Sequence, residues 1–218
     1  MADVISLADH RAARLRAPAA GATETPRRRV TFFFDLASPF TYLAVERIDR
    51  LFPDARWVPA SGEALHRGDP WIDPAARAAA DRRARGLHIP LSWPDRPSEG
   101  ARGAMRAAAH AADCGHAANF VIAASRLAFC GGFDLDDPEV LAEAAAAADL
   151  GLGGCLSAAR DEGRDGAIEE AGRSLLAAGA DRLPAVRVAG HVYAGEQRIA
   201  EATMAMRSQA GGRIPHAG

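Results

Sequence analysis

Apolar and polar residues follow a different pattern at the two ends of the chain than in its middle. Residues 30–35 form a short apolar and aromatic run, which predicts a strand. Pro39 suits the first turn of a helix, and we expect this helix to continue to about residue 52. After a break at Pro53-Asp54, residues 55–59 predict a second strand. This order predicts one β-α-β unit that is complete by about residue 60.

Helical character dominates from about residue 61 to residue 179. Alanine-rich segments of helical length, separated by Gly and Pro, predict helices over residues 74–85, 101–114, 117–129, 138–148, 152–160 and 167–178. The acidic residues and proline at positions 136–139 are typical of a helix start, because carboxylates stabilise the positive end of the helix dipole. The middle of the chain therefore predicts an all-helical region.

Strand character returns near the end of the chain. Residues 185–188 and 192–193 flank Ala189-Gly190-His191, which predicts a tight hairpin, and a last helix is expected over residues 198–208. The order β-α-β, helices, β-β-α is that of a thioredoxin fold with a helical domain inserted in its middle. We therefore expect a flexible tail over residues 1–27, a thioredoxin-like domain over 28–62 and 180–210, and a helical insertion domain over 63–179.

Composition narrows the classes of function. A chain of 218 residues can form one compact domain, or a domain with a large insertion, and its 49% hydrophobic residues supply a core. The net charge of -2 gives no electrostatic reason to expect nucleic acid or a membrane surface as a partner. All 26 residues counted as Lys or Arg are arginines. Because the chain has no lysine, catalysis through a Schiff base is excluded. No apolar run approaches a membrane span and the start does not resemble a secretory signal, so we expect a cytoplasmic protein.

Cysteine usage argues against redox and metal chemistry. Cys114, Cys130 and Cys155 are odd in number and widely spaced, and none belongs to a C-x-x-C pair, which disfavours a disulfide scaffold and a dithiol centre. His110 and Cys114 lie four residues apart on one predicted helix, a spacing that zinc ligands can have. No second pair with such spacing follows, so we expect ordinary packing there and no metal.

The segment from residue 34 to 44, FDLASPFTYLA, is the most specific motif of the chain. It resembles the F-D-x-x-S-P-[YF]-[ST]-[YW]-L-A opening of the 2-hydroxychromene-2-carboxylate isomerases and kappa-class glutathione transferases, in the DsbA-like branch of the thioredoxin superfamily. Residues 182–185 (RLPA) resemble the family's G-[VL]-P-[TA] element with its cis-proline, and residues 194–198 (AGEQR) resemble its W/F-G-x-D-R motif. The resemblance covers roughly residues 29–208. It implies an α/β, thioredoxin-like fold with a large all-helical insertion (DsbA-like).

The resemblance also implies a function and a set of site residues. It implies an isomerase or transferase that uses glutathione or another low-molecular-weight thiol on a small aromatic substrate, in the degradation of aromatic compounds. Family members are commonly dimers, so a homodimer is expected as well. By the resemblance, Ser38 would be catalytic, and Phe40 and Trp93 could shape the substrate pocket. The residues implied in thiol binding are Leu183, Pro184 (expected cis), Ala194, Gly195, Glu196 and Gln197.

Two interpretations of the role of Ser38 are open. A hydroxyl at a helix N-terminus lies beside unpaired N–H groups and the positive end of the dipole, and it could donate to a bound thiolate and lower its pKa from about 8.5. Alternatively, Ser38 only caps its helix, because serine before proline is an ordinary cap. Trp93 likewise has an alternative as an anchor of the core.

Two departures from the family leave a second function open. The acidic residue that holds the ammonium of glutathione is Gln197 here, and Glu196 either substitutes for it or, with Gln197, belongs to a solvated turn. The lysine of the isomerases is missing, and Gly68-Asp69-Pro70 only weakly matches their asparagine-containing loop. These losses favour a catalytically degenerate, thioredoxin-like binding protein, whereas the intact motif favours the enzyme. A dithiol oxidoreductase is rejected, because Ser38 and Thr41 stand where that chemistry needs two sulfurs.

Overall fold

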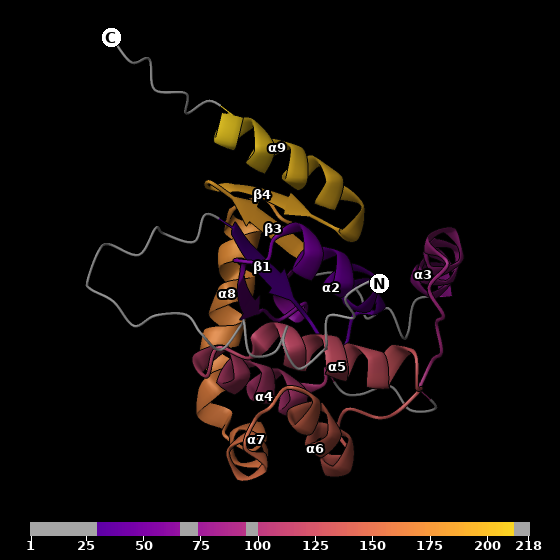
Figure 1. Ribbon diagram of the computed structural model, residues 1–218, viewed down its shortest axis with the longest axis vertical. Coiled ribbons are helices and arrows are strands. Elements are labelled where there is room, and N and C mark those ends of the chain that lie inside the picture. Colours follow the sequence, from indigo (N-terminus) through magenta and orange to yellow (C-terminus); the bar gives the residue numbers. More distant parts are fainter. Residues whose placement is uncertain (1–29, 66–73, 95–99, 212–218) are drawn as a thin grey trace, which may run out of the picture.

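A four-stranded mixed sheet forms the centre of the molecule (Figure 1). The computed structural model describes residues 30–65, 74–94 and 100–211, so the predicted tail at 1–27 and Gly68-Asp69-Pro70 lie outside the described residues. The strands are β1 (Val30–Phe34), β2 (Arg56–Pro59), β3 (Ala185–Val188) and β4 (His191–Ala194). Their order is β2-β1-β3-β4, with β2 parallel to β1 and both other pairings antiparallel. The two ends of the chain thus meet in one sheet, as the sequence predicts.

The central strand β1 is buried on both faces, which explains why all its residues except Thr31 are apolar. Successive side chains of a strand point to opposite faces. Phe32 and Phe34 accordingly pack in the larger core with Trp57, whereas Phe33 packs in a smaller core with Leu175. Both sides of the sheet therefore need covering by helices.

Helices cover both faces of the sheet. α2 (Pro39–Leu51) and α9 (Ile199–Gly211) contribute Ile48 and Ile199 to the larger core, and α8 (Asp165–Ala177) closes the smaller one. α2 begins directly at Pro39, one residue after Ser38, because proline fits the first helical turn. This junction places Ser38 just after the C-terminal end of β1.

The remaining helices form the helical region in the middle of the chain (Figure 1). They are η1 (Glu63–Leu65), α3 (Pro74–Leu87), α4 (Arg102–Asp113), α5 (Ala117–Phe129), α6 (Pro138–Ala147), α7 (Leu152–Ala159) and η2 (Glu162–Arg164). The start of α6 has the predicted cap, in which the Asp137 carboxylate accepts a hydrogen bond of 2.8 Å from the Glu139 N–H. Alanines on the inner side of α4 are fully buried, because small side chains let neighbouring helices approach closely.

Some boundaries differ from the sequence-based expectation. α8 begins at Asp165 rather than at 167, and β4 covers His191–Ala194 rather than two residues. A 3₁₀ turn, η3 (Glu196–Arg198), precedes α9. None of the helices within residues 30–65, 74–94 and 100–211 is long and apolar enough to cross a membrane.

Candidate functional site

Ser38 lies at the junction of β1 and α2, with its hydroxyl unused by the helix. Its backbone is extended (φ -91°, ψ 121°), and its side chain makes no capping hydrogen bond to the first turn of α2. The Ser38 N–H donates to the Asp35 carbonyl at 3.1 Å, and the Ser38 carbonyl accepts from the Thr41 N–H at 3.0 Å. The main chain is thus fixed while the hydroxyl stays available. This geometry removes the hydrogen bond on which the capping interpretation depends.

Asp35 ties this junction to the loop after β2. Its carboxylate accepts hydrogen bonds of 2.9 Å from the N–H groups of Ala37 and Gly62. A Cβ atom at position 62 would lie 2.8 Å from Asp35 Oδ2, so glycine is needed for the close approach. The Asp35 carboxylate therefore holds the β1–α2 junction and the loop after β2 together beside Ser38.

A cavity of about 850 Å³ opens beside Ser38. Its walls come from the β1–α2 junction, η1, one side of α3, the segment before β3, and the β4–η3 turn. Of the residues that the sequence predicts for the site, those lining it are Ser38, Phe40, Leu183, Ala194, Gly195, Glu196 and Gln197. Cysteine is absent from these walls, so any sulfur chemistry there needs an external thiol.

Two predicted residues lie outside the walls of this cavity. Pro184 is buried, and the Leu183-Pro184 peptide bond is cis, as the resemblance implies. The indole of Trp93 instead packs edge-on against Phe129 and donates from Nε1 to the Asp81 carboxylate at 2.9 Å. Trp93 thus fastens the segment after α3 to the helical region.

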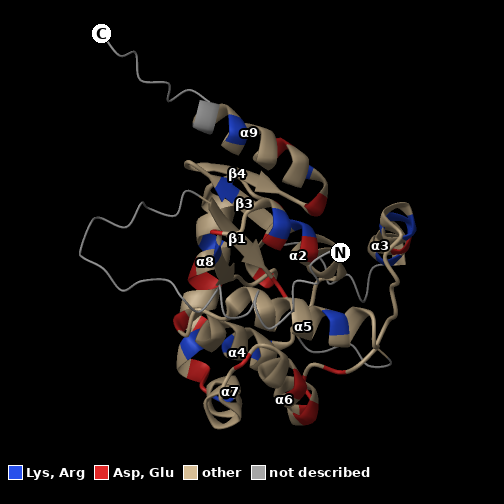
Figure 2. Cartoon of the chain, in the orientation of Figure 1, with Lys and Arg blue, Asp and Glu red and all other residues tan. Residues whose placement is uncertain are grey.

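Glu196 is held by two arginines that sequence reasoning missed. The residue is only 2% exposed, and its carboxylate accepts two hydrogen bonds from Arg83, at 2.7 and 2.9 Å. Arg47 also pairs with it, so α2, α3 and η3 meet in one ionic cluster. Basic residues are visible on both helices that supply these side chains (Figure 2). Burial, and then the positive charges of Arg83 and Arg50, lower the pKa of Arg47 from its usual value.

Comparisons with known proteins bear on the fold. The sequence matches no model of a known protein family, and no curated protein matches it either. The structure is similar to a 2-hydroxychromene-2-carboxylate isomerase, with a TM-score of 0.70 and 17% identity, over 84% of this chain and 96% of that one. It is also similar to a candidate DsbA oxidoreductase from Streptomyces coelicolor (TM-score 0.65, 19% identity, 86% and 92% coverage). A candidate protein disulfide isomerase from Nitrosomonas europaea matches with a TM-score of 0.60, 16% identity, and 84% and 97% coverage.

The chain has the DsbA-like thioredoxin fold. This confirms the predicted thioredoxin-like fold with its helical insertion. The identities of 16% to 19% reach the fold and no further, so the finer family and the roles of the site residues stay predictions.

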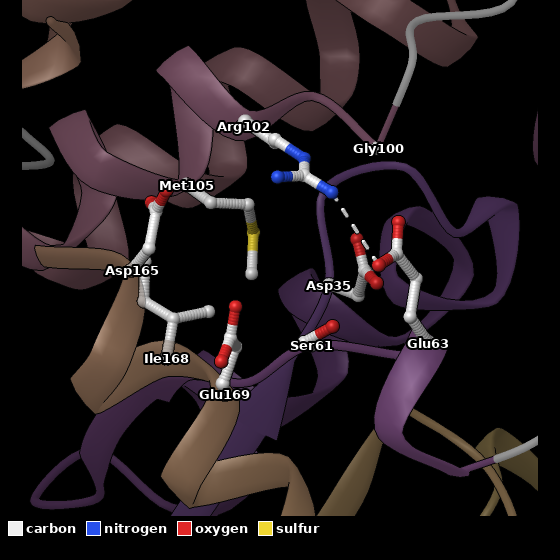
Figure 3. Close-up of a pocket in the computed structure, with 9 residues that line it drawn as sticks. All are labelled: Asp35, Ser61, Glu63, Gly100, Arg102, Met105, Asp165, Ile168 and Glu169. Atoms are coloured by element: carbon white, nitrogen blue, oxygen red, sulfur yellow. Dashed lines mark ion pairs between the residues drawn. The ribbon is translucent and has the colours of Figure 1, made fainter. Parts of the chain in front are cut away.

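A small side pocket of about 50 Å³ adjoins the cavity of this DsbA-like fold (Figure 3). It shares Asp35, Glu63 and Gly100 with the large cavity, and Arg102 reaches across it to Glu63 at 3.5 Å. The sulfur of Met105 points into the pocket. A space of this size is too small for an organic substrate, so the large cavity remains the candidate site.

The described residues offer little for metal or redox chemistry. Within them, His, Cys, Asp and Glu form no group of three or more that could hold a metal ion. Cys114 Sγ lies 3.7 Å from His110 Nε2, on the surface. Cys130 is also exposed, whereas Cys155 is buried, and this burial raises the pKa of its thiol.

Proposed function

We propose that the protein is a thiol-dependent isomerase or transferase that acts on a small aromatic substrate in the cavity beside Ser38. The observation that carries this proposal is the Ser38 hydroxyl, which is not used as a helix cap and lines a cavity that contains no cysteine. The cavity can hold both a tripeptide-sized thiol and a small ring, since ligand sites of about 300–1,000 Å³ are typical. The similarity to a 2-hydroxychromene-2-carboxylate isomerase supports an aromatic substrate.

A bound thiol would supply a sulfur nucleophile, and the chain's own residues would position and activate it. Ser38 donates its O–H to the sulfur, and the N-terminus of α2 adds the positive end of a helix dipole. Both interactions favour the thiolate, which is the reactive form. Leu183 lines the same cavity as Ser38, and Phe40 offers an aromatic face to the substrate ring.

The test of this function is the variant Ser38→Ala. A hydrogen bond to a charged group contributes about 1.5–3 kcal/mol. Its loss should therefore raise the pKa of the bound thiol by one to two units and lower the turnover about ten- to a hundredfold at neutral pH. Calorimetry measures thiol binding, and a pH series of the thiolate absorbance measures the pKa. Ser92→Ala is the matched control, because Ser92 is exposed and lies outside the cavity. The proposal fails if neither glutathione nor any other low-molecular-weight thiol binds.

A second function is a thioredoxin-like binding protein without catalysis. One observation favours it: Glu196, the only carboxylate of η3, is already occupied by Arg47 and Arg83 and cannot hold a ligand ammonium. In that case the cavity would bind a partner's peptide, and Ser38→Ala would leave binding unchanged. Activity of the purified protein on aromatic substrates, with and without thiol, separates the two functions.

A further inference from the structure

The cavity wall around η3 is rich in arginine. We call this wall the η3 end and define it by Arg182, Gly195, Glu196, Gln197 and Arg198, all of which line the cavity. Arg182 lies against Gly195, where a Cβ atom would come within 3.0 Å of the Arg182 Cδ atom. Gly195 has a φ of 95°, so glycine at this position both makes the turn and leaves room for the arginine.

Each described carboxylate at or beside the η3 end is already bound to an arginine. Asp181 binds Arg182 at 2.9 and 2.8 Å. Glu201 binds Arg198 through one oxygen, at 3.0 and 2.7 Å. Glu196 holds Arg83 through two hydrogen bonds and pairs with Arg47 as well. Within the described residues, a ligand ammonium that enters this wall therefore meets carboxylates whose charge is already balanced.

Within the described residues, the ion pairs at and beside the η3 end contain four arginines and three carboxylates, so positive charge is in excess. Two guanidinium groups, those of Arg47 and Arg83, share the single carboxylate of Glu196. The Nε atom of Arg47 is buried and has no hydrogen-bond partner within the described residues. Gln197, which is exposed toward the cavity, adds a neutral amide that can donate or accept. The balance of fixed charge favours a ligand group that is negative over one that is positive.

We propose that the η3 end recognises an anionic head group that carries no ammonium, so that the thiol used by this protein has a carboxylate there without an adjacent amino group. This proposal rests on the proposed thiol-dependent function. Arg182 and Arg198 are the direct partners, since both line the cavity with about half of their side chains exposed. Each uses Nε and Nη2 for its own carboxylate, which leaves Nη1 for a ligand carboxylate. Guanidinium groups bind carboxylates in a planar, two-hydrogen-bond geometry.

The experiment compares glutathione with deaminated glutathione, in which a glutaryl group replaces the γ-glutamyl group. The two probes keep the same carboxylates and thiol and differ only in the ammonium. Calorimetry should show that the deaminated form binds at least about fivefold more tightly, the effect expected of one unit charge a few ångströms from a partly screened opposite or like charge. Tighter binding of glutathione would overturn the proposal.

Two matched variants test the electrostatic cause. Gln197→Asp adds a carboxylate that no arginine yet binds, and it should reverse the preference toward glutathione. Gln197→Asn has the same size as the aspartate variant but no charge, and it should keep the preference for the deaminated form. If both variants behave alike, the fixed charge at the η3 end does not set the preference and the proposal is wrong.

S-methylated versions of both probes distinguish this proposal from the proposed function. They lack the reactive thiol but keep the head group. Selective binding of the S-methylated deaminated form, without thiol-dependent activity, would sustain the head-group site and refute the catalytic function. Failure of all four probes to bind would refute both.

Discussion

Replacing Glu196 by glutamine should destabilise the protein more than removing any exposed carboxylate. The change keeps the size of the side chain and removes one negative charge at a site that is 2% exposed. Arg83 loses a two-hydrogen-bond partner, and Arg47 loses its opposite charge. Two guanidinium groups then face each other across a neutral amide, with no other carboxylate bound to either in the described residues.

The size of the effect follows from the burial of the three side chains. Removing one partner of a buried ion pair costs about 3–5 kcal/mol. The side chains of Arg47 and Arg83 are 24% and 34% exposed, so water screens part of their repulsion. We therefore expect the free energy of unfolding to fall by about 2–3 kcal/mol. With a urea slope of about 2–3 kcal/mol/M, the midpoint should move down by about 1 M.

Urea denaturation followed by circular dichroism measures this change. Glu201→Gln is the control, because Glu201 pairs with a single arginine, Arg198, and both side chains are about half exposed. An exposed pair contributes about 0.2–1 kcal/mol, so the control should hardly move the midpoint. If Glu196→Gln costs no more than Glu201→Gln, the cluster does not stabilise the fold and the reasoning is refuted. Hydrogen exchange adds a local test, since amides of α3 should lose protection in Glu196→Gln more than amides of α4.

Two further predictions concern packing and pH. Gly172→Ala should cost about 1–3 kcal/mol, because its Cβ would lie 2.6 Å from the Ser61 carbonyl oxygen. Gly166→Ala in the same helix meets nothing within 4 Å and should stabilise by up to about 1 kcal/mol; equal urea midpoints for the two variants would contradict this. Burial, with a smaller contribution from Cys130, raises the pKa of Tyr42 from 10.0 to about 12. Between pH 10 and 12 the folded state therefore keeps a proton that the unfolded state loses. The free energy of unfolding should fall over this range. The absorbance titration of Tyr193→Phe, in which Tyr42 is the only tyrosine, should show ionisation near pH 12, and ionisation at pH 10 would contradict it.

The fold can be predicted from the sequence where one physical cause determines the local pattern of apolar and polar residues. β1 is buried on both faces, so all its residues except Thr31 are apolar and the strand is easy to recognise. The starts of α2 and α6 carry proline in the first turn, which fixes their boundaries. β4 was too short in the prediction, because its ends are His191 and Ala194, which have no strand preference. Their place in the sheet comes from pairing with β3, a tertiary contact.

The candidate site is less readable, because its charges pair across long distances in the chain. Ser38 and Leu183 belong to motifs, and the structure brings both to one cavity. Nothing in the local sequence of α2 or α3 distinguishes Arg47 and Arg83 from the many surface arginines. Only the fold shows that they meet at Glu196. In the sequence the many arginines are only a feature of composition, whereas in the structure two of them bind a buried carboxylate.

Neighbouring residues in a tight turn can have opposite roles. At η3 one residue therefore cannot be assumed to take over the role of the residue next to it. Glu196 and Gln197 are adjacent, so in the sequence the glutamate could supply the charge that glutamine lacks. In the structure Glu196 is buried and bound to two arginines, whereas Gln197 is exposed. At this wall a ligand therefore meets the neutral amide of Gln197 and the guanidinium groups of Arg182 and Arg198, each paired with a carboxylate, and not a free Glu196 carboxylate. A carboxylate contributes to recognition only in so far as its charge is not already balanced, which is why the head-group preference of this cavity can differ from that implied by its motifs.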